Sequence, residues 1–248
     1  MSDVLEVNGI PVLASKADLE TGHPVVIVIH GMSTTAETLR TGWPDHQRDG
    51  LTRVYWRLPV LRQERDTVIA RQKEDVFRSL FWPVVHEARQ ELTQLIASLG
   101  RTKVGLFGFS IGGLISLWGA LDNPQVAASV AVGGVPYLDY LLNYFPDYDW
   151  EAPDVKACRE AIDLRSYVST LAQKPTLVLH GLADEQAKWE WMKHFSDALL
   201  LHPQSRHDRR LYDHVQHRLT GASDVREEAD LANLRETATN FFIQHLSE

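Results

Sequence analysis

The sequence predicts an α/β fold with a mostly parallel central sheet flanked by helices. Short β-branched runs recur along the chain, segments with a 3.6-residue apolar period separate them, and several runs end in glycine. Strands that alternate with helices form βαβ units, which build parallel sheets. With 248 residues, 44% of them hydrophobic, the chain can bury one large core, so a single domain over residues 1–248 is expected.

Six apolar runs are expected to form the sheet. The run Val25–Ile29 is β-branched throughout, which is typical of a parallel strand buried on both faces. The run 208–212 is more polar and is expected nearer an edge. The opening residues 5–14 alternate around Asn8-Gly9, which predicts a small hairpin. The other expected strands cover residues 53–58, 103–107, 127–132 and 176–179.

Four longer segments have helical patterns. Residues 83–99 carry apolar side chains at a 3.6-residue period, and Gly100 follows as a stop. Residues 110–121 are apolar all round, which predicts a buried helix. The segments 185–201 and 226–246 are amphipathic and should cover the sheet.

One connection is longer than a single crossover helix needs. Residues 135–174 lie between two expected strands and hold six aromatic side chains within fourteen positions. We expect this segment to form a small helical cap insertion over one end of the sheet. Its interleaved acidic residues would disfavour anionic substrates, although a solvated charged face explains them equally well.

The run G-F-S-I-G at 108–112 links an expected strand directly to an expected helix. A serine on such a tight strand-to-helix turn has a strained backbone, and side chains at Gly108 and Gly112 would collide with the neighbouring strand and helix. The turn exposes the Ser110 hydroxyl beside a helix N-terminus, where negative charge is favoured. Ser110 is therefore a candidate nucleophile; the alternative is a glycine-rich turn with an incidental serine.

With this motif the chain resembles the α/β-hydrolase superfamily, specifically its serine esterase, lipase-like and prolyl-oligopeptidase-like members. The resemblance covers roughly residues 24–246 and implies the chain order nucleophile, acid, base. It implies a serine hydrolase that cleaves a carboxylic ester of a small, uncharged substrate through an acyl-enzyme. Such an enzyme needs no metal and no organic cofactor.

The resemblance also assigns the oxyanion hole and the acid. The His-Gly turn at 30–32 follows an expected strand, so the amides of Met32 and Ile111 would hold the oxyanion. The pattern H-G-x-x-D at 180–184 makes Asp184 the acid that orients the histidine. Alternatively, the His-Gly turn merely ends a strand, and Asp184 caps the helix that follows.

Two histidines compete for the role of base. In the resembling family the base lies about five residues beyond the aromatic residue that closes the last strand, and counting from Tyr212 reaches His217. His214 comes too soon after that strand to reach Ser110, although it can still line the site or bond to the acid loop. The family's usual glycine before the base is Gln216 here, which leaves the loop geometry open.

The cap tyrosines are candidates for the substrate pocket. Tyr137, Tyr140 and Tyr144 would form a wall of that pocket, with His214 beside them. The alternative is that these tyrosines are an ordinary amphipathic face that packs on the sheet.

Charge and cysteine content exclude several other classes. The net charge of −8 disfavours nucleic acid and anionic membrane surfaces as partners, so a small-molecule substrate is expected. One cysteine permits no intrachain disulfide and no cysteine-rich metal site, and no histidine spacing fits a metal site. The N-terminus lacks a signal-peptide pattern, so a cytoplasmic protein is expected.

Several activities use the same residues. Peptidase, thioesterase, lactonase or perhydrolase chemistry would need the same triad, and a carbon–carbon or cyanohydrin lyase also occurs on this fold. A non-catalytic binding module is the least favoured alternative, because all three triad positions and both glycines are present.

Overall fold

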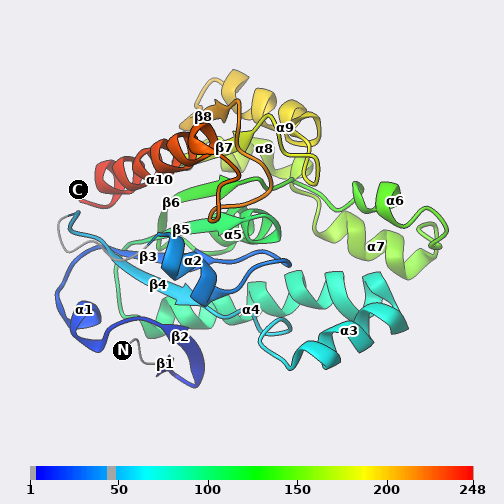
Figure 1. Cartoon of the computed structure of the whole chain (residues 1–248), viewed down its shortest axis with the longest axis horizontal. Coiled ribbons are helices and arrows are strands. Elements are labelled where there is room, and N and C mark those ends of the chain that lie inside the picture. Colours follow the sequence, from blue (N-terminus) through cyan, green and yellow to red (C-terminus); the bar gives the residue numbers. More distant parts are fainter. Residues whose placement is uncertain (1–3, 44–48, 248) are drawn as a thin grey trace.

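One eight-stranded sheet forms the centre of the computed structural model, which describes residues 4–43 and 49–247 (Figure 1). The strand order is β1-β2-β4-β3-β5-β6-β7-β8, and every pairing from β4 to β8 is parallel. The predicted α/β class with a mostly parallel sheet is thereby confirmed. The strands are β1 (Val4–Val7), β2 (Ile10–Leu13), β3 (Val25–Ile29), β4 (Thr52–Trp56), β5 (Val104–Phe109), β6 (Val126–Val132), β7 (Thr176–Gly181) and β8 (His207–Tyr212).

The antiparallel part of the sheet is the predicted hairpin. Strands β1 and β2 pair with Val7 opposite Ile10, and β2 continues the sheet by pairing antiparallel with β4. Asn8 and Gly9 turn the chain with φ angles of 53° and 78°. Two successive positive φ angles suit the right-handed twist of a two-residue hairpin, which is why Asn-Gly is favoured there.

The burial of the strand residues agrees with the hydrophobic patterns of the strand sequences. Every residue of β3, β4, β5 and β7 is buried, as expected for strands covered on both faces. Strand β8 has mixed burial and lies at the edge of the sheet, as its polar sequence predicts.

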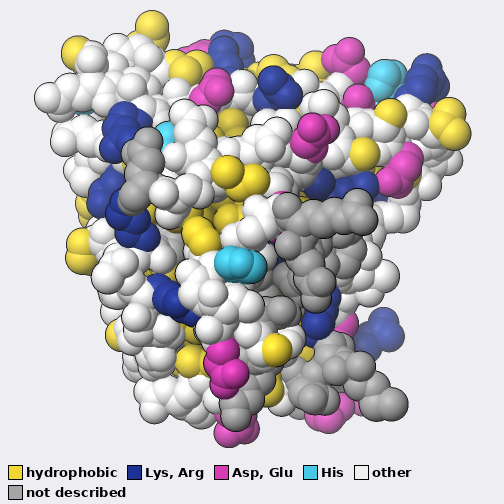
Figure 2. Space-filling model, turned by 90° about the vertical axis from the view of Figure 1, so that its left-hand side faces the viewer, with side chains coloured by type: hydrophobic (Ala, Val, Ile, Leu, Met, Phe, Trp, Pro, Cys, Tyr) yellow, Lys and Arg dark blue, Asp and Glu magenta, His cyan; other side chains and the backbone are white. Residues whose placement is uncertain are grey.

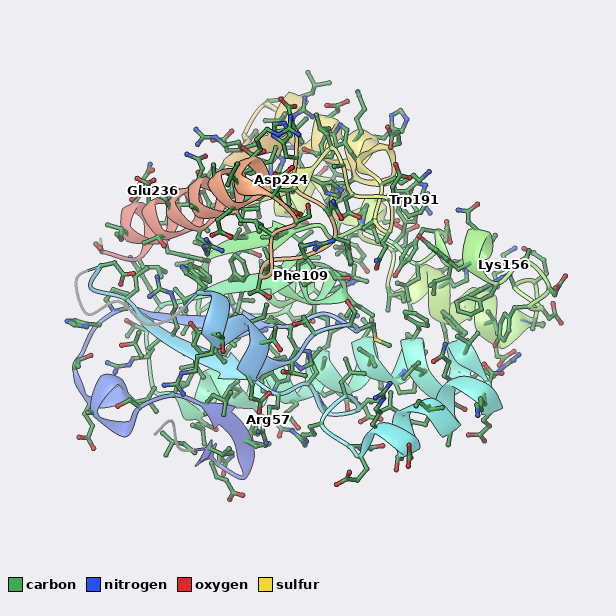
Figure 3. The ribbon with its side chains drawn as sticks, in the orientation of Figure 1. Arg57, Phe109, Lys156, Trp191, Asp224 and Glu236 are labelled. Carbon is green, nitrogen blue, oxygen red and sulfur yellow. The ribbon has the colours of Figure 1, made fainter. Side chains whose placement is uncertain are left out.

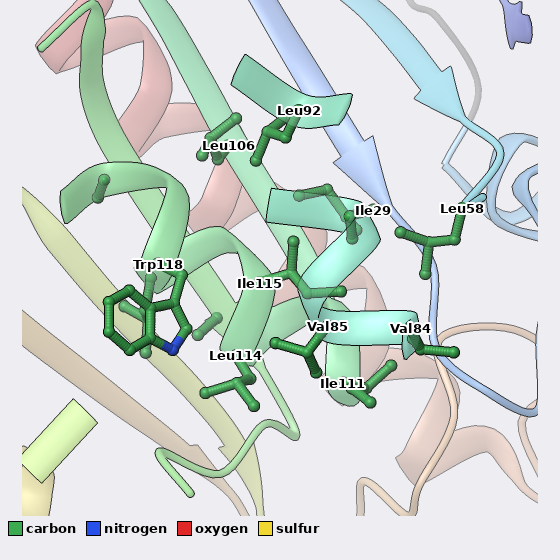
Figure 4. Close-up of a cluster of buried hydrophobic side chains, with 14 of the residues drawn as sticks. Ile29, Leu58, Val84, Val85, Leu92, Leu106, Ile111, Leu114, Ile115 and Trp118 are labelled. Atoms are coloured by element: carbon green, nitrogen blue, oxygen red, sulfur yellow. The ribbon is translucent and has the colours of Figure 1, made fainter. Parts of the chain in front are cut away.

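Helices cover both faces of the sheet. Apolar residues of α4, α5 and α9 pack on one face, and those of α2 and α10 pack on the other. Figure 4 shows the first of these clusters, where Ile111 and Ile115 of α5 lie against Val84 and Val85 of α4. The helices are α1 (Lys16–Glu20), α2 (Ala36–Gly42), α3 (Arg65–Glu74), the π-helix η1 (Val76–Phe81), α4 (Trp82–Ser98), α5 (Ile111–Asp122), α6 (Leu141–Tyr144), α7 (Pro153–Ala161), the 3₁₀-helix η2 (Leu164–Tyr167), α8 (Val168–Leu171), α9 (Trp189–Leu201) and α10 (Val225–Leu246).

One helix starts later than the sequence predicts, and one helical pair was not predicted. The helix expected over 185–201 begins only at Trp189, because the Asp184 carboxylate accepts the amides of Gln186 and Ala187 and holds a turn there. The pair α3–η1 was not expected at all. Helix α3 buries no residue, so it has no apolar period that a sequence pattern could reveal.

Residues 135–174 contain α6, α7, η2 and α8. Figure 1 shows α6 and α7 standing off the sheet at the same end of the molecule as α3. An ion-pair cluster links the two regions: Arg78 of η1 donates to Asp154 of α7 at 2.6 Å, and Tyr148 donates to Asp75 at 2.6 Å. Trp118 of α5 ties the segment to the sheet layer by donating to a carbonyl at Ile162.

Basic, acidic and hydrophobic side chains all occur on the face of the molecule shown in Figure 2, which is the left-hand side of Figure 1. None of the helices within residues 4–43 and 49–247 has the length and apolar character needed to cross a membrane.

Candidate active site

Ser110 lies on the sharp turn between β5 and α5. Its φ and ψ are 58° and −123°, a region that non-glycine residues rarely adopt. A Cβ at Gly108 would overlap the Gly112 carbonyl and lie 2.6 Å from Gly113 N, and a Cβ at Gly112 would lie 2.8 Å from the His30 carbonyl oxygen. The steric reason predicted for both glycines is confirmed, since neither position has room for a side chain.

A hydrogen-bonded chain joins three side chains from three loops. His217 Nε2 is 2.9 Å from Ser110 Oγ, and His217 Nδ1 is 2.7 Å from Asp184 Oδ2. The side chains of His217 and Asp184 are 7% and 1% exposed, so water hardly competes for these bonds. A carboxylate can only accept hydrogen bonds, so the His217 proton lies on Nδ1 and is donated to Asp184. His217 Nε2 is then free to accept a hydrogen bond from the Ser110 hydroxyl.

The carboxylate of Asp184 is fixed on both oxygens. Oδ1 accepts the amides of Gln186 and Ala187 at 2.9 and 2.8 Å, while Oδ2 faces His217. Asp184 therefore caps the turn that follows β7 and also orients the histidine. The alternative that Asp184 caps the following helix is not realised, because α9 begins at Trp189 with Lys188 at its N-cap and no side-chain cap.

His214 lies away from this chain of hydrogen bonds. Its Nδ1 and its amide both contact Asp230 Oδ2 at 3.0 Å, so the side chain turns toward α10. The expectation that His214 lines the substrate pocket is wrong, because it is not among the residues around the cavity described below. Phe109 instead packs against His217, with ring centroids 5.0 Å apart; Figure 3 shows Phe109 near the loop that descends from Asp224.

The His-Gly turn after β3 touches the serine turn directly. A Cβ at Gly31 would lie 2.8 Å from Ser110 Cβ, so only glycine permits this approach. His30 holds the turn as a buried neutral ring: Nδ1 donates to the Gly31 carbonyl at 2.9 Å, and Nε2 accepts the Leu58 amide at 3.2 Å. Burial lowers the pKa of His30, against the opposing effect of the Gly31 hydrogen bond.

A cavity of about 280 Å³ opens beside Ser110. Both residues expected at the oxyanion hole, Met32 and Ile111, line it, and so do Tyr140 and Tyr144. Tyr137, which was expected in the pocket, is not among the lining residues; the Arg165 guanidinium lies over its ring at 4.2 Å. The full lining is Met32, Ser33, Phe81, Ser110, Ile111, Gly133, Val135, Tyr140, Leu141, Tyr144, Phe145, Gln186, Ala187 and His217.

Sequence reasoning missed two aromatic walls of the cavity. Phe81, at the end of η1, and Phe145, just after α6, approach each other edge to face with ring centroids 6.5 Å apart. Tyr140 stacks on Trp191 of α9 at 5.4 Å, and burial raises its pKa well above the ordinary value. Phe145 lay inside the aromatic run of the expected cap, but no local pattern singled out Phe81.

The cavity has little charge around it. The described residues that line it include no Lys, Arg, Asp or Glu. Three acidic residues of the 135–174 segment pair with arginines that do not line the cavity: Asp139 with Arg159 at 2.6 Å and with Arg165 at 2.8 Å, Asp154 with Arg78 at 2.6 Å, and Asp163 with Arg165. In the part of the chain that the structure covers, no three His, Cys, Asp or Glu side chains gather into a group suited to a metal ion.

A parallel sheet with a serine turn after its central strand and an acid and a histidine on later loops defines an α/β hydrolase. Residues 85–248 match the model of the prolyl oligopeptidase family. The chain belongs to that family and is a serine hydrolase. No curated protein matches the chain.

Solved structures with the same fold include esterases and a peptidase. TT1662 from Thermus thermophilus is 19% identical, with 100% of this chain and 98% of that one covered and a TM-score of 0.74. Est1E from Butyrivibrio proteoclasticus is 14% identical, with 100% and 99% covered and a TM-score of 0.63. The acylaminoacyl peptidase of Pyrococcus horikoshii is 14% identical with a TM-score of 0.64; the match covers 95% of this chain but 39% of that one.

Proposed function

We propose that the protein hydrolyses carboxylic esters of small, uncharged substrates through an acyl-enzyme on Ser110. The observation that carries this proposal is the cavity beside Ser110, whose described lining is mostly apolar and aromatic and includes no Lys, Arg, Asp or Glu. Its volume of about 280 Å³ is at the small end of the range found for ligand sites, which suits a small substrate. In this proposal the 135–174 segment is the cap that supplies one wall of the cavity.

In the proposed mechanism His217 removes the proton of Ser110 while Oγ attacks the ester carbonyl carbon. The amides of Met32 and Ile111 stabilise the oxyanion, each by about 3 kcal/mol. His217 then protonates the alcohol as it leaves, and Asp184 stabilises the imidazolium. Water activated by His217 attacks the acyl-enzyme in the second half of the reaction and releases the acid.

Family membership supports a second candidate, cleavage of an uncharged, N-blocked peptide. A peptidase that recognises a free α-ammonium group needs a carboxylate near the scissile bond, and the described lining of the cavity supplies none. An N-acylated aminoacyl p-nitroanilide, assayed beside the free aminoacyl p-nitroanilide and short-chain p-nitrophenyl esters, separates these activities.

Ser110→Ala is expected to abolish turnover of p-nitrophenyl esters together with the initial burst of p-nitrophenol. The cause is the loss of the only group that forms the acyl-enzyme, and a decrease in kcat of about 10⁶-fold is typical for such a loss. Stopped-flow absorbance measures the burst, and labelling with a fluorophosphonate followed by peptide mass analysis locates the modified residue. Full activity in the variant, or labelling at another residue of the active wild type, would contradict the proposal.

A carboxylate on the acyl group is expected to lower kcat/KM by about 100-fold relative to a neutral acyl group of equal length. A charge that enters the cavity loses water without gaining a cationic partner. The measurement compares the p-nitrophenyl esters of pentanoic acid and of the mono-anion of butanedioic acid at constant ionic strength. Equal kcat/KM values for the two esters would show that the acyl group does not occupy this cavity.

A further inference from the structure

The loop that carries His217 is held by two carboxylates of α10, of which Glu227 is buried and Asp230 is partly exposed. In this loop, residues 213–224, Gln216 occupies the position where the resembling family has glycine. The side chain of Glu227, in the first turn of α10, is 1% exposed. Its Oε1 accepts the Gln216 amide at 3.0 Å, directly beside His217, and its Oε2 accepts the amide and the hydroxyl of Ser223 at 2.6 and 2.7 Å.

The helix N-terminus favours an ionised Glu227. Asp224 is the N-cap of α10, so Glu227 is the third residue of the helix, where negative charge is stabilised by the helix dipole. Burial alone would raise the pKa of Glu227, but the hydrogen bonds from Ser223 and Gln216, together with the Arg218 guanidinium 3.5 Å from Oε1, lower it overall. At this position a glutamate usually returns to the amide of its own N-cap. Here the carboxylate is directed to the histidine loop instead.

A second carboxylate of α10 and a glycine of β7 hold the same loop. Asp230, one turn after Glu227, accepts the His214 amide at 3.0 Å. Val215 lies between these two anchors and is buried against β7, where a Cβ at Gly181 would lie 2.7 Å from its carbonyl carbon. The backbone is thus fixed on both sides of Val215, and His217 is the first residue beyond the Gln216 anchor.

We propose that Glu227 is a positioning residue for the catalytic histidine. Through the Gln216 amide it fixes the backbone from which His217 reaches both Ser110 and Asp184, and so it substitutes for the turn that glycine provides in the resembling family. This inference rests on the proposed role of His217 as the general base. A displacement of about 1 Å in a reacting group can lower turnover by about 100-fold.

The test compares Glu227→Gln with Glu228→Gln. Glutamine has the same size as glutamate, but one of the two carboxylate oxygens becomes an NH₂ group. That group cannot accept a hydrogen bond from the Gln216 amide or from Ser223. Glu228 is the matched control, because it lies next to Glu227 on α10, is 56% exposed, and its carboxylate pairs with Arg235 rather than with the Gln216 amide. Arg235 itself donates to the Leu219 carbonyl, on the opposite side of His217 from the Gln216 anchor. We expect Glu227→Gln to lower kcat by about 10- to 100-fold with KM changed less than about twofold, and Glu228→Gln to leave both unchanged.

A readout independent of turnover is the NMR resonance of the His217 Nδ1 proton. In the wild type this proton lies in the bond to Asp184 and should give a strongly downfield signal. We expect the signal to shift or broaden in Glu227→Gln and to stay in place in Glu228→Gln. A wild-type kcat together with an unchanged signal in Glu227→Gln would overturn the inference.

The two measurements separate this inference from the proposed function. If the wild type turns over no ester, the proposed function fails, while the Nδ1 resonance still reports whether Glu227 positions His217. If circular dichroism shows that Glu227→Gln does not fold, Glu227→Asp decides. It retains the charge at the helix N-terminus but shortens the reach, so a lower kcat and a shifted signal support the inference and wild-type values for both overturn it.

Discussion

His217→Ala is expected to lower kcat for p-nitrophenyl esters by about 10⁴-fold or more, while His214→Ala lowers it by less than about 10-fold. The first substitution removes the only imidazole within hydrogen-bonding distance of Ser110 Oγ among the described residues. The second removes a ring that contacts Asp230 on α10 and does not line the cavity. Steady-state kinetics on both variants, with thermal unfolding as a check on folding, measure the difference.

The two histidines form a matched pair, since they lie three positions apart on one loop. The His214 amide still donates to Asp230 when the ring is removed, so its substitution leaves the loop anchored. A greater loss of turnover in His214→Ala than in His217→Ala would transfer the role of base to His214 and contradict the proposed mechanism.

Gly108→Ala is expected to lower the free energy of unfolding by at least about 3 kcal/mol and to slow the reaction of Ser110 with a fluorophosphonate. The new Cβ would overlap backbone atoms of Gly112 and Gly113, which cannot move without displacing the start of α5. Because the amide of Ile111 belongs to this turn, the substitution disturbs stability and the proposed oxyanion hole together. Urea denaturation and the labelling rate provide the two measurements.

Gly100→Ala is the control for a glycine substitution. Gly100 has a φ of 63°, and a Cβ there would meet no atom within 4 Å. Its substitution should cost about 1–2 kcal/mol from backbone strain alone and leave the labelling rate unchanged. If Gly108→Ala unfolds at the same urea concentration as the wild type, the close packing of the serine turn is not needed for stability.

The features that could be predicted from sequence are those encoded by neighbouring residues. The run Val25–Ile29 indicated a buried parallel strand because both faces of β3 are covered, and Asn8-Gly9 indicated a turn because both residues adopt positive φ angles. The serine turn could be predicted because its motif is contiguous in sequence: Gly108 is required by contacts with Gly112 and Gly113, although Gly112 is required by the distant Ile29 and His30.

The cavity could not be predicted in the same way, because its walls come from distant segments. Phe81 is the last residue of a π-helix that interrupts the 3.6-residue period, and it meets Phe145 only in the folded chain. Tyr137 was assigned to the pocket from its place in an aromatic run, but the cationic Arg165 binds its ring from η2. The anchoring of His214 by Asp230 likewise depends on where α10 packs.

The reacting side chains and two aromatic walls of the cavity come from different segments of the chain, and this separation affects how substrate preference can evolve. Ser110, Asp184 and His217 are carried by loops at the ends of strands, whereas Phe81 and Phe145 come from η1 and from the segment after α6. The cluster of Arg78, Asp75, Tyr148 and Asp154 joins those two segments to each other. Sequence change in this region can therefore reshape the cavity as a unit, so lineages that share one serine-hydrolase reaction can diverge in the substrates that they accept.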